Sequence, residues 1–334
     1  SLQSPILAVA IGQTEGPRPR GNHRSVQAGR ETFAWRSLED MQARVKKACA
    51  ILDNLSRLQH RPNIVIFPEY SIPIEYALDS LQAKADEHDL MIVPGSDNIT
   101  QPHTPTILNQ SPVLLPRKDP IWVAKRELSQ WEFGFIDLPP EAPITLFSWK
   151  CNGKSYWFSV YICLDLLLAI TDPVYSHPGP GLFLVPMCSP DVQTLRTYAD
   201  ALLRRPDGSA CVLCNCIGEG AAGQSCVAAI IPGGKPLLPA LDLPENIEAV
   251  AVVDIDLDHL VQPRKSVPGL PSAIGRRSIH TVHTVPDGTA LIPSDPMRDT
   301  ARVRGVINPS LFQFMGKRMR IALLSVDKFA EVGQ

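Results

Sequence analysis

Three polar residues whose side chains could act together in catalysis each follow an apolar stretch of the sequence. Glu69 follows the apolar residues 64–67 and Pro68, Lys125 follows "IWVA", and Cys163 follows "WFSVYI". An apolar run without polar alternation, such as 64–67, predicts a strand that is covered on both faces. We therefore expect each reactive group at the end of a core strand, a position that often carries working acids, bases and nucleophiles.

A carboxylate, an ammonium group and a thiol match the needs of nucleophilic catalysis. A cysteine nucleophile requires a base that takes up its proton and a positive group that stabilises an oxyanion. Glu69 is predicted as the base and Lys125 as the fixed positive charge. Cys163 would then attack an electron-poor carbon and form a thioester that water hydrolyses. This chemistry needs no metal, and we expect no cofactor.

Each of these residues also has a simpler interpretation when it is taken alone. Glu69 could cap a helix or pair with an arginine, Lys125 could be a solvated lysine, and Cys163 could be an inert buried thiol. The presence of all three residues, with Asp165 two residues after the cysteine, favours the catalytic interpretation.

Three further cysteines lie in the stretch "ACVLCNCIG". Cys211 and Cys214 form a C-x-x-C pair and Cys216 follows, which could indicate zinc. The stretch is predicted to be one strand, and no second Cys or His pair follows closely, so no metal site is predicted.

The order and context of these motifs resemble those of the nitrilase superfamily, the carbon–nitrogen hydrolases. "FPEY" resembles the Phe-Pro-Glu at the family's catalytic base, "KREL" its Lys-x-x-Leu, and "ICLDL" its Ile-Cys-Tyr/Trp-Asp. "FLVPMCSP", "CNCIG" and "GQSCVAAIIPGGK" match three later segments in the same order. The resemblance implies an α/β fold, the four-layer α-β-β-α sandwich, for a carbon–nitrogen hydrolase domain at 1–261.

The resemblance also implies roles for two further residues. Glu132, seven residues after Lys125, would be a second glutamate that helps to position substrate, and Leu164 would offer its backbone N–H to the oxyanion. The sequence departs from the family at Leu164, where an aromatic residue is usual, and at Val123, where a tyrosine is frequent.

The periodicity of the chain predicts helices and strands in alternation, typical of layered α/β proteins. Apolar residues at intervals of three or four predict a helix over 37–59 with Ser37 as N-cap, and helices are also expected at 75–88 and 192–205. Residues 14–30 are expected to form a polar loop, and 107–158 to form short antiparallel strands with turns.

Residues 262–334 are predicted to be a C-terminal extension of the hydrolase domain. The extension is expected to contribute an interface or to link the domain to a larger chain. The link is suggested by two features: these residues match no segment of the family, and the sequence begins with "SLQSP" rather than with Met. Its apolar run "MRIALLSV" is a candidate additional strand.

The composition is that of a soluble globular protein. Of the 334 residues, 44% are hydrophobic and 20% are charged, and the formal net charge of -2 gives no general attraction to nucleic acid or to an anionic membrane. No apolar run reaches the ~18 residues of a membrane span, and no signal peptide is recognised, so a cytoplasmic location is expected.

The predicted function is hydrolysis of a non-peptide carbon–nitrogen bond through a cysteine thioester. A small amide is the favoured substrate, ahead of a nitrile or a carbamoyl-amine, and the resemblance implies a homo-oligomer. The alternative function is that of an assembly or sensing domain with this fold inside a larger protein, for instance a bacterial defence protein.

Overall fold

The computed structural model describes fourteen stretches of the chain. The described residues are 6–16, 24–27, 30–33, 37–58, 61–139, 144–151, 154–169, 181–203, 209–218, 221–231, 235–236, 241–256, 279–285 and 321–325.

One central sheet has five strands, of which β1, β4 and β5 run parallel; β18 is antiparallel to β1, and β20 is antiparallel to β18. In spatial order the strands are β20 (Ile321–Ser325), β18 (Ala249–Asp256), β1 (Ile6–Gln13), β4 (Ile64–Ile66) and β5 (Met91–Val93).

The second central sheet has eight strands, with β10, β11 and β12 parallel to one another. In spatial order the strands are β16 (Lys235–Pro236), β15 (Cys226–Ile231), β12 (Ser209–Asn215), β11 (Leu182–Met187), β10 (Lys154–Val160), β9 (Ile144–Cys151) and β19 (Ile279–Val285), with β17 (Leu241–Asp242) also paired to β15.

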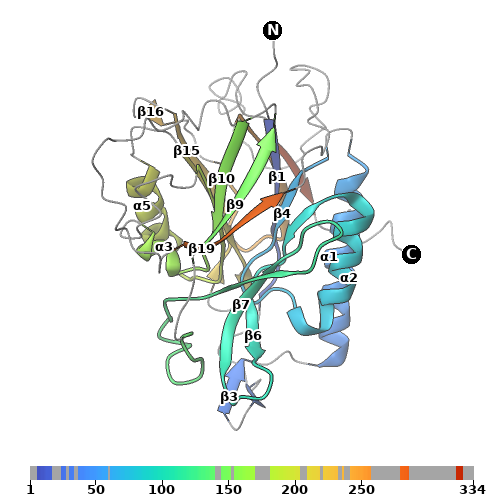
Figure 1. Cartoon of the computed structure of the whole chain (residues 1–334), viewed down its shortest axis with the longest axis vertical. Helices are drawn as coiled ribbons and strands as arrows, with labels where there is room; N and C mark the ends of the chain where they lie inside the picture. Colours follow the sequence, from blue (N-terminus) through green and yellow to red (C-terminus); the bar gives the residue numbers. More distant parts are fainter. Residues whose placement is uncertain are drawn as a thin grey trace.

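Helices cover the outer faces of both sheets, and Figure 1 shows α1 and α2 on one side of the molecule and α3 and α5 on the other. The helices are α1 (Leu38–Ser56), α2 (Ile74–His88), α3 (Asp165–Leu168) and α5 (Val192–Leu203). One cluster of buried apolar side chains joins the two sheets, a second joins α1 and α2 to the five-stranded sheet, and a third joins α3 and α5 to the other sheet. The layers therefore follow the order helix, sheet, sheet, helix.

Strand β1 shows why its apolar sequence does not alternate with polar residues. Leu7, Val9 and Ile11 point into the cluster between the sheets, whereas Ala8 and Ala10 face the helices. Successive side chains of a strand point to opposite faces, so a strand between two apolar layers must be apolar throughout.

The predicted helices are confirmed, with small differences at their ends. Helix α1 begins after Ser37, whose hydroxyl accepts a hydrogen bond from the Asp40 N–H at 3.1 Å. That bond satisfies one of the free N–H groups in the first helical turn, which is the role predicted for Ser37. None of the described helices combines the length and the apolar character that crossing a membrane requires.

Three small sheets complete the described strands. The expected antiparallel strands at 107–124 are present, joined by β6, which was not predicted, in the sheet β6 (Asp97–Thr100), β7 (Ile107–Val113) and β8 (Ile121–Ala124). The prediction of a loop over 14–30 is wrong, since β2 (Arg24–Gln27) and β3 (Arg30–Phe33) form an antiparallel pair. The third pair is β13 (Ile217–Gly218) with β14 (Ala221–Ala222).

The region after residue 261 contributes one described strand to each central sheet. Strand β20, which lies in the apolar run predicted as an additional strand, pairs with β18, and β19 pairs with β9. The described strands of the predicted extension are therefore part of the sandwich.

Candidate active site

Glu69 lies just beyond the carboxyl end of β4, as the sequence predicted, and only 1% of its surface is exposed. The backbone before Glu69 packs closely against Gly95, which has a φ of 85°: a Cβ on Gly95 would lie 1.9 Å from the Pro68 oxygen. Tyr70 follows at a φ of 57° and donates its N–H to the Ser96 oxygen at 2.8 Å. A bulky residue with positive φ is uncommon, and such strained positions cluster at functional sites.

Lys125 follows β8 directly and is 2% exposed, so it is not the solvated lysine of the simpler interpretation. Its backbone N–H donates to the Asn109 oxygen on β7 at 2.8 Å. This bond continues the pairing of β7 and β8 and places the lysine and asparagine side chains in the same region of the core.

Cys163 lies between β10 and the short helix α3 and is 3% exposed. Its N–H donates to the Pro186 oxygen at 2.9 Å, and its φ of 50° is in the left-handed region. The strand therefore ends in a strained turn at the cysteine, which is the strand-to-turn position that the sequence predicted.

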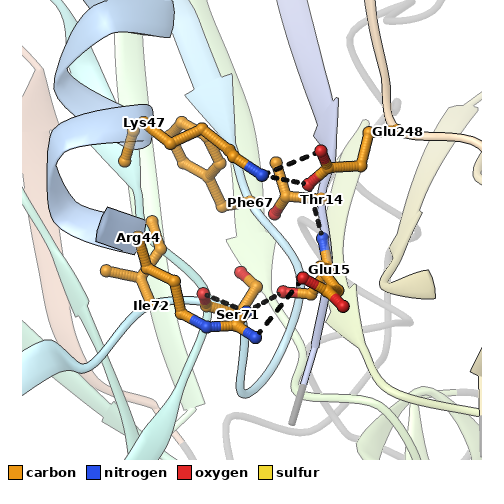
Figure 2. A pocket seen from close by; sticks show the side chains of 9 residues that line it. Thr14, Glu15, Arg44, Lys47, Phe67, Ser71, Ile72 and Glu248 are labelled. Carbon is orange, nitrogen blue, oxygen red and sulfur yellow. Dashed lines mark hydrogen bonds and ion pairs between the residues drawn. The ribbon is translucent and has the colours of Figure 1, made fainter. Parts of the chain in front are cut away.

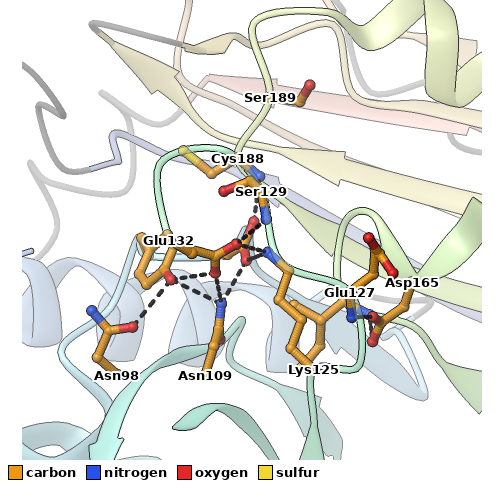
Figure 3. Close-up of polar contacts among 12 residues, drawn as sticks. Asn98, Asn109, Lys125, Glu127, Ser129, Glu132, Asp165, Cys188 and Ser189 are labelled. Atoms are coloured by element: carbon orange, nitrogen blue, oxygen red, sulfur yellow. Dashed lines mark hydrogen bonds and ion pairs between the residues drawn. The ribbon is translucent and has the colours of Figure 1, made fainter. Parts of the chain in front are cut away.

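The side chains of Glu69, Lys125 and Glu132 meet in one buried cluster, part of which is shown in Figure 3. The Lys125 Nζ donates to Glu69 Oε1 at 2.8 Å and to Glu132 Oε2 at 2.7 Å. The Asn109 Nδ2 lies 2.8 Å from Glu69 Oε1 and 2.7 Å from Glu132 Oε1. Buried charges are stable only when they are paired and hydrogen-bonded, and this cluster meets both conditions.

The ionisation of the cluster follows from its burial and from the positive charge of Lys125. Burial raises the pKa of Glu69, which Lys125 opposes only in part. Burial alone would raise the pKa of Glu132 as well. The ammonium of Lys125 and the hydrogen bonds to Glu132 outweigh burial, so the pKa of Glu132 is lowered. For Lys125, burial lowers the pKa and the two carboxylates raise it well above its usual value, so the lysine stays charged.

The thiol of Cys163 responds to the same charges. Burial and the negative charge of Glu69 raise its pKa well above the usual value, while Lys125 acts in the opposite direction. These shifts favour the protonated thiol, and the carboxylate of Glu69, whose charge acts on this thiol, also has a raised pKa. A carboxylate with a raised pKa is suited to accept a proton from a thiol.

Asp165 connects the cysteine turn to the lysine segment. Its Oδ1 accepts the N–H groups of Arg126 and Glu127, each at 2.8 Å (Figure 3). Burial raises the pKa of Asp165 to about 7. One carboxylate thereby fixes the residues after Lys125 against the residues after Cys163.

The sequence did not single out Asn109, Tyr70 or Cys188, which complete the cluster. The Cys188 N–H donates to Glu69 Oε2 at 3.0 Å and also acts on the Cys163 thiol. Their places in the strand order could have indicated two of them. Asn109 lies on β7, which pairs with the strand before Lys125, and Cys188 follows β11, the parallel neighbour of β10.

The C-x-x-C pair is split between two faces of β12. Cys211 packs toward α5, whereas Cys214 packs between the sheets. Cys216, just beyond the strand, instead shares a thiol hydrogen bond with Cys188 that raises the pKa of the Cys188 thiol. The side chains of Cys211 and Cys214 therefore cannot hold one metal ion together.

A small pocket lies on the α1 side of the five-stranded sheet and is separate from this cluster (Figure 2). The Lys47 Nζ lies 2.8 Å from Glu248 Oε2. The guanidinium of Arg44 donates to the backbone oxygens of Glu15, Gly16 and Ser71. These bonds connect α1 to the segments that follow β1 and β4 and to the residue before β18.

Comparison with known proteins identifies the fold. No family model matches the sequence, and no curated protein matches it. Among solved structures, Nit3 from Saccharomyces cerevisiae, described as a member of branch 10 of the nitrilase superfamily, matches 81% of this chain and 98% of its own at 17% identity, with a TM-score of 0.56. The chain has the nitrilase-superfamily fold.

Two further solved structures share this nitrilase fold. Glutamine-dependent NAD+ synthetase from Acinetobacter baumannii matches 80% of this chain at 17% identity and a TM-score of 0.54, and this chain spans 49% of its length. A mutant of the amidase from Nesterenkonia sp. AN1, with the acetamide moiety of fluoroacetamide attached to its active-site cysteine, matches 78% of this chain and 94% of its own at 16% identity and a TM-score of 0.51.

Proposed function

We propose that this protein is a carbon–nitrogen hydrolase that cleaves a small amide through a thioester on Cys163. One observation carries the proposal: a buried cluster of Glu69, Lys125 and Glu132 acts electrostatically on the thiol of a cysteine in a strained turn. The nitrilase fold and the amidase among its structural neighbours support the same reaction class.

The first half of the reaction follows from the proton affinities. Glu69 takes the thiol proton as the Cys163 sulfur attacks the amide carbon, because burial has raised the affinity of this carboxylate for a proton. The ammonium of Lys125 and the Leu164 N–H stabilise the oxyanion that develops on the substrate. The protonated Glu69 then donates to the leaving nitrogen, ammonia departs, and the acyl group remains on sulfur.

The second half uses the same groups in reverse order. Glu69, now ionised, takes a proton from water as the water oxygen attacks the thioester carbon. The carbon–sulfur bond breaks, the Cys163 sulfur recovers a proton from Glu69, and the carboxylic acid leaves. Burial of the cluster strengthens each electrostatic step because little water is present to screen it.

Release of ammonia from a panel of small amides, nitriles and carbamoyl-amines tests the proposal. We expect activity on at least one amide, abolished in Cys163→Ser and reduced about 100-fold or more in Glu69→Gln, the range for loss of a general base. Cys49→Ser is the matched control, because this half-buried thiol lies on α1 outside the cluster. Ammonia release that survives Cys163→Ser would contradict the proposal.

Fluoroacetamide is a second probe, which tests the nucleophile directly. The neighbouring amidase carries its acetamide moiety on the active-site cysteine. We expect the same adduct on Cys163 of this protein, found by peptide mass spectrometry, and none on Cys49.

A further inference from the structure

The two carboxylates of the cluster do not receive the same number of hydrogen bonds. Glu132 accepts bonds from Lys125 Nζ at 2.7 Å, the Ser129 N–H at 2.8 Å, Asn109 Nδ2 at 2.7 Å and the Tyr70 hydroxyl at 2.7 Å. From the residues that the structure describes, Glu69 accepts three, from Lys125 Nζ, Asn109 Nδ2 and the Cys188 N–H. Hydrogen bonds to the ionised form favour that form, so the carboxylate with more donors holds its charge more firmly.

The phenol of Tyr70 supplies the additional donor. Its hydroxyl is 2.7 Å from Glu132 Oε1 and 3.1 Å from Asn98 Oδ1, and its single proton goes to the nearer, charged acceptor. The same oxygen lies 2.9 Å from Asn109 Nδ2, which has two protons for three nearby acceptors, the oxygens of Glu69, Glu132 and Tyr70. Burial and the neighbouring carboxylates raise the pKa of Tyr70 well above its usual value, so the hydroxyl keeps its proton.

The backbone holds this ring in place despite strain. Tyr70 is 5% exposed, has a φ of 57°, and is fixed through its N–H to the Ser96 oxygen. A left-handed conformation is unfavourable in a residue with a side chain. The surrounding turn therefore maintains an unfavourable conformation at the residue that donates to Glu132.

We propose that Tyr70 is a positioning residue that keeps Glu132 ionised against Lys125 and so leaves Glu69 as the carboxylate that takes the proton of Cys163. This inference rests on the proposed function. Two carboxylates share one ammonium, and a proton that enters the cluster binds the one with fewer donors. The opposite pKa directions of Glu69 and Glu132 agree with this division of roles.

The pH dependence of the cluster involves several other titratable groups. The groups whose charges act on Glu132 or on Tyr70 are Lys125, Glu69, Cys163 and Asp97. Lys125 stays charged and Cys163 stays protonated near neutral pH. Asp165, with a pKa of about 7, is the same in wild type and in Tyr70→Phe. A difference between these two chains in the acid limb, the acidic side of the pH–rate profile of Cys163, therefore reports the two glutamates.

The test is the rate of Cys163 alkylation by iodoacetamide as a function of pH in Tyr70→Phe, followed by mass spectrometry of the full chain. Removing the hydroxyl takes a donor from Glu132 and stabilises protonated forms of the cluster. We expect the acid limb of the rate to move up by about one pH unit, and the rate near that limb to fall about tenfold. Tyr76→Phe is the matched control, because Tyr76 is 46% exposed on α2.

Repeating the measurement in a chain that carries Glu132→Gln shows whether Tyr70 acts through Glu132 or only through its packing. If Tyr70 acts through Glu132, Tyr70→Phe shifts nothing further in a Glu132→Gln chain. An acid limb that stays in place in Tyr70→Phe, or that moves equally in the Glu132→Gln background, overturns the inference while the proposed function stands. If the wild-type acid limb is the same in Glu69→Gln, the proposed function fails and this inference fails with it.

Discussion

At the scale of single residues, the site depends on one positive charge shared by two carboxylates. Lys125 is 2% exposed and lies within 2.8 Å of both Glu69 and Glu132. A buried pair is strongly destabilised when one partner is removed, because the other is left uncompensated. The residues proposed for catalysis are thus also a structural requirement of the core.

We predict that Lys125→Met destabilises the protein by about 3–5 kcal/mol at neutral pH. Without the ammonium, the folded-state pKa of both glutamates rises above the unfolded value. Stability of the variant should therefore increase as the pH falls toward the unfolded pKa of glutamate. Urea unfolding of both chains between pH 5 and 8, in roughly unit steps, measures this; a variant whose deficit is constant across that range would contradict the account.

Asp165 gives a second pH prediction, with Asp165→Asn as the variant. Its folded pKa of about 7 lies above its usual 3.8, so folding favours the protonated form. This acid therefore lowers stability progressively as the pH rises from about 4 to about 7.

The asparagine retains the oxygen that accepts the Arg126 and Glu127 N–H groups but does not ionise. Its stability relative to wild type should rise over the same pH range, by at most about 4 kcal/mol. Thermal melting of both chains tests this, and parallel curves would show that burial does not perturb the Asp165 carboxyl.

At the scale of elements, the site forms where strands of separate sheets end. Glu69 follows β4 of the five-stranded sheet, Lys125 follows β8, and Cys163 follows β10 of the eight-stranded sheet. Parallel strands carry their ligand and catalytic groups at their carboxyl ends. Because Glu69 lies in the turn after β4, the conformation of this turn determines where its carboxylate is placed.

Gly95→Ala tests that turn, with Gly134→Ala as the matched control. Both glycines have a positive φ, 85° and 86°, but a Cβ would clash with the Pro68 oxygen only at Gly95 and would meet nothing within 4 Å at Gly134. We expect a cost of about 1 kcal/mol at Gly134 and several times more at Gly95. Denaturant midpoints measure both, and equal costs would contradict the proposed close approach.

At the scale of the whole molecule, strands distant in sequence complete both sheets. Strand β20 pairs with β18, and β19 pairs with β9, so the region after residue 261 supplies an outer strand to each central sheet. Unpaired strand edges invite aggregation. The sandwich therefore depends on strands beyond the predicted hydrolase domain.

Ending the chain at residue 256 is predicted to lower the melting temperature by about 10 °C or more and to reduce solubility, because the edges of β9 and β18 become unpaired. A chain ended at residue 325, which keeps β19 and β20, is the control. Differential scanning fluorimetry of the two chains decides between them, and equal melting temperatures would mean that the two outer strands do not stabilise the sheets.

The sequence predicted the strands and helices whose pattern is local, and the three residues that end core strands. It did not predict β2, β3 or β6, because strands such as "DNIT" have neither apolar alternation nor an apolar run. It also missed Tyr70 and Asn109 as members of the cluster. Their contacts with Glu132 join residues 62 and 23 positions apart, and such distances are fixed by sheet packing rather than by local pattern.

The most direct test of the central claim is intact-mass and peptide-mass measurement after limited iodoacetamide treatment at neutral pH. The account predicts one rapidly formed adduct on Cys163, absent from Cys163→Ala and formed more slowly in Glu69→Gln. Uniformly slow labelling that neither substitution changes would contradict it, because the thiol would then lack an activating base.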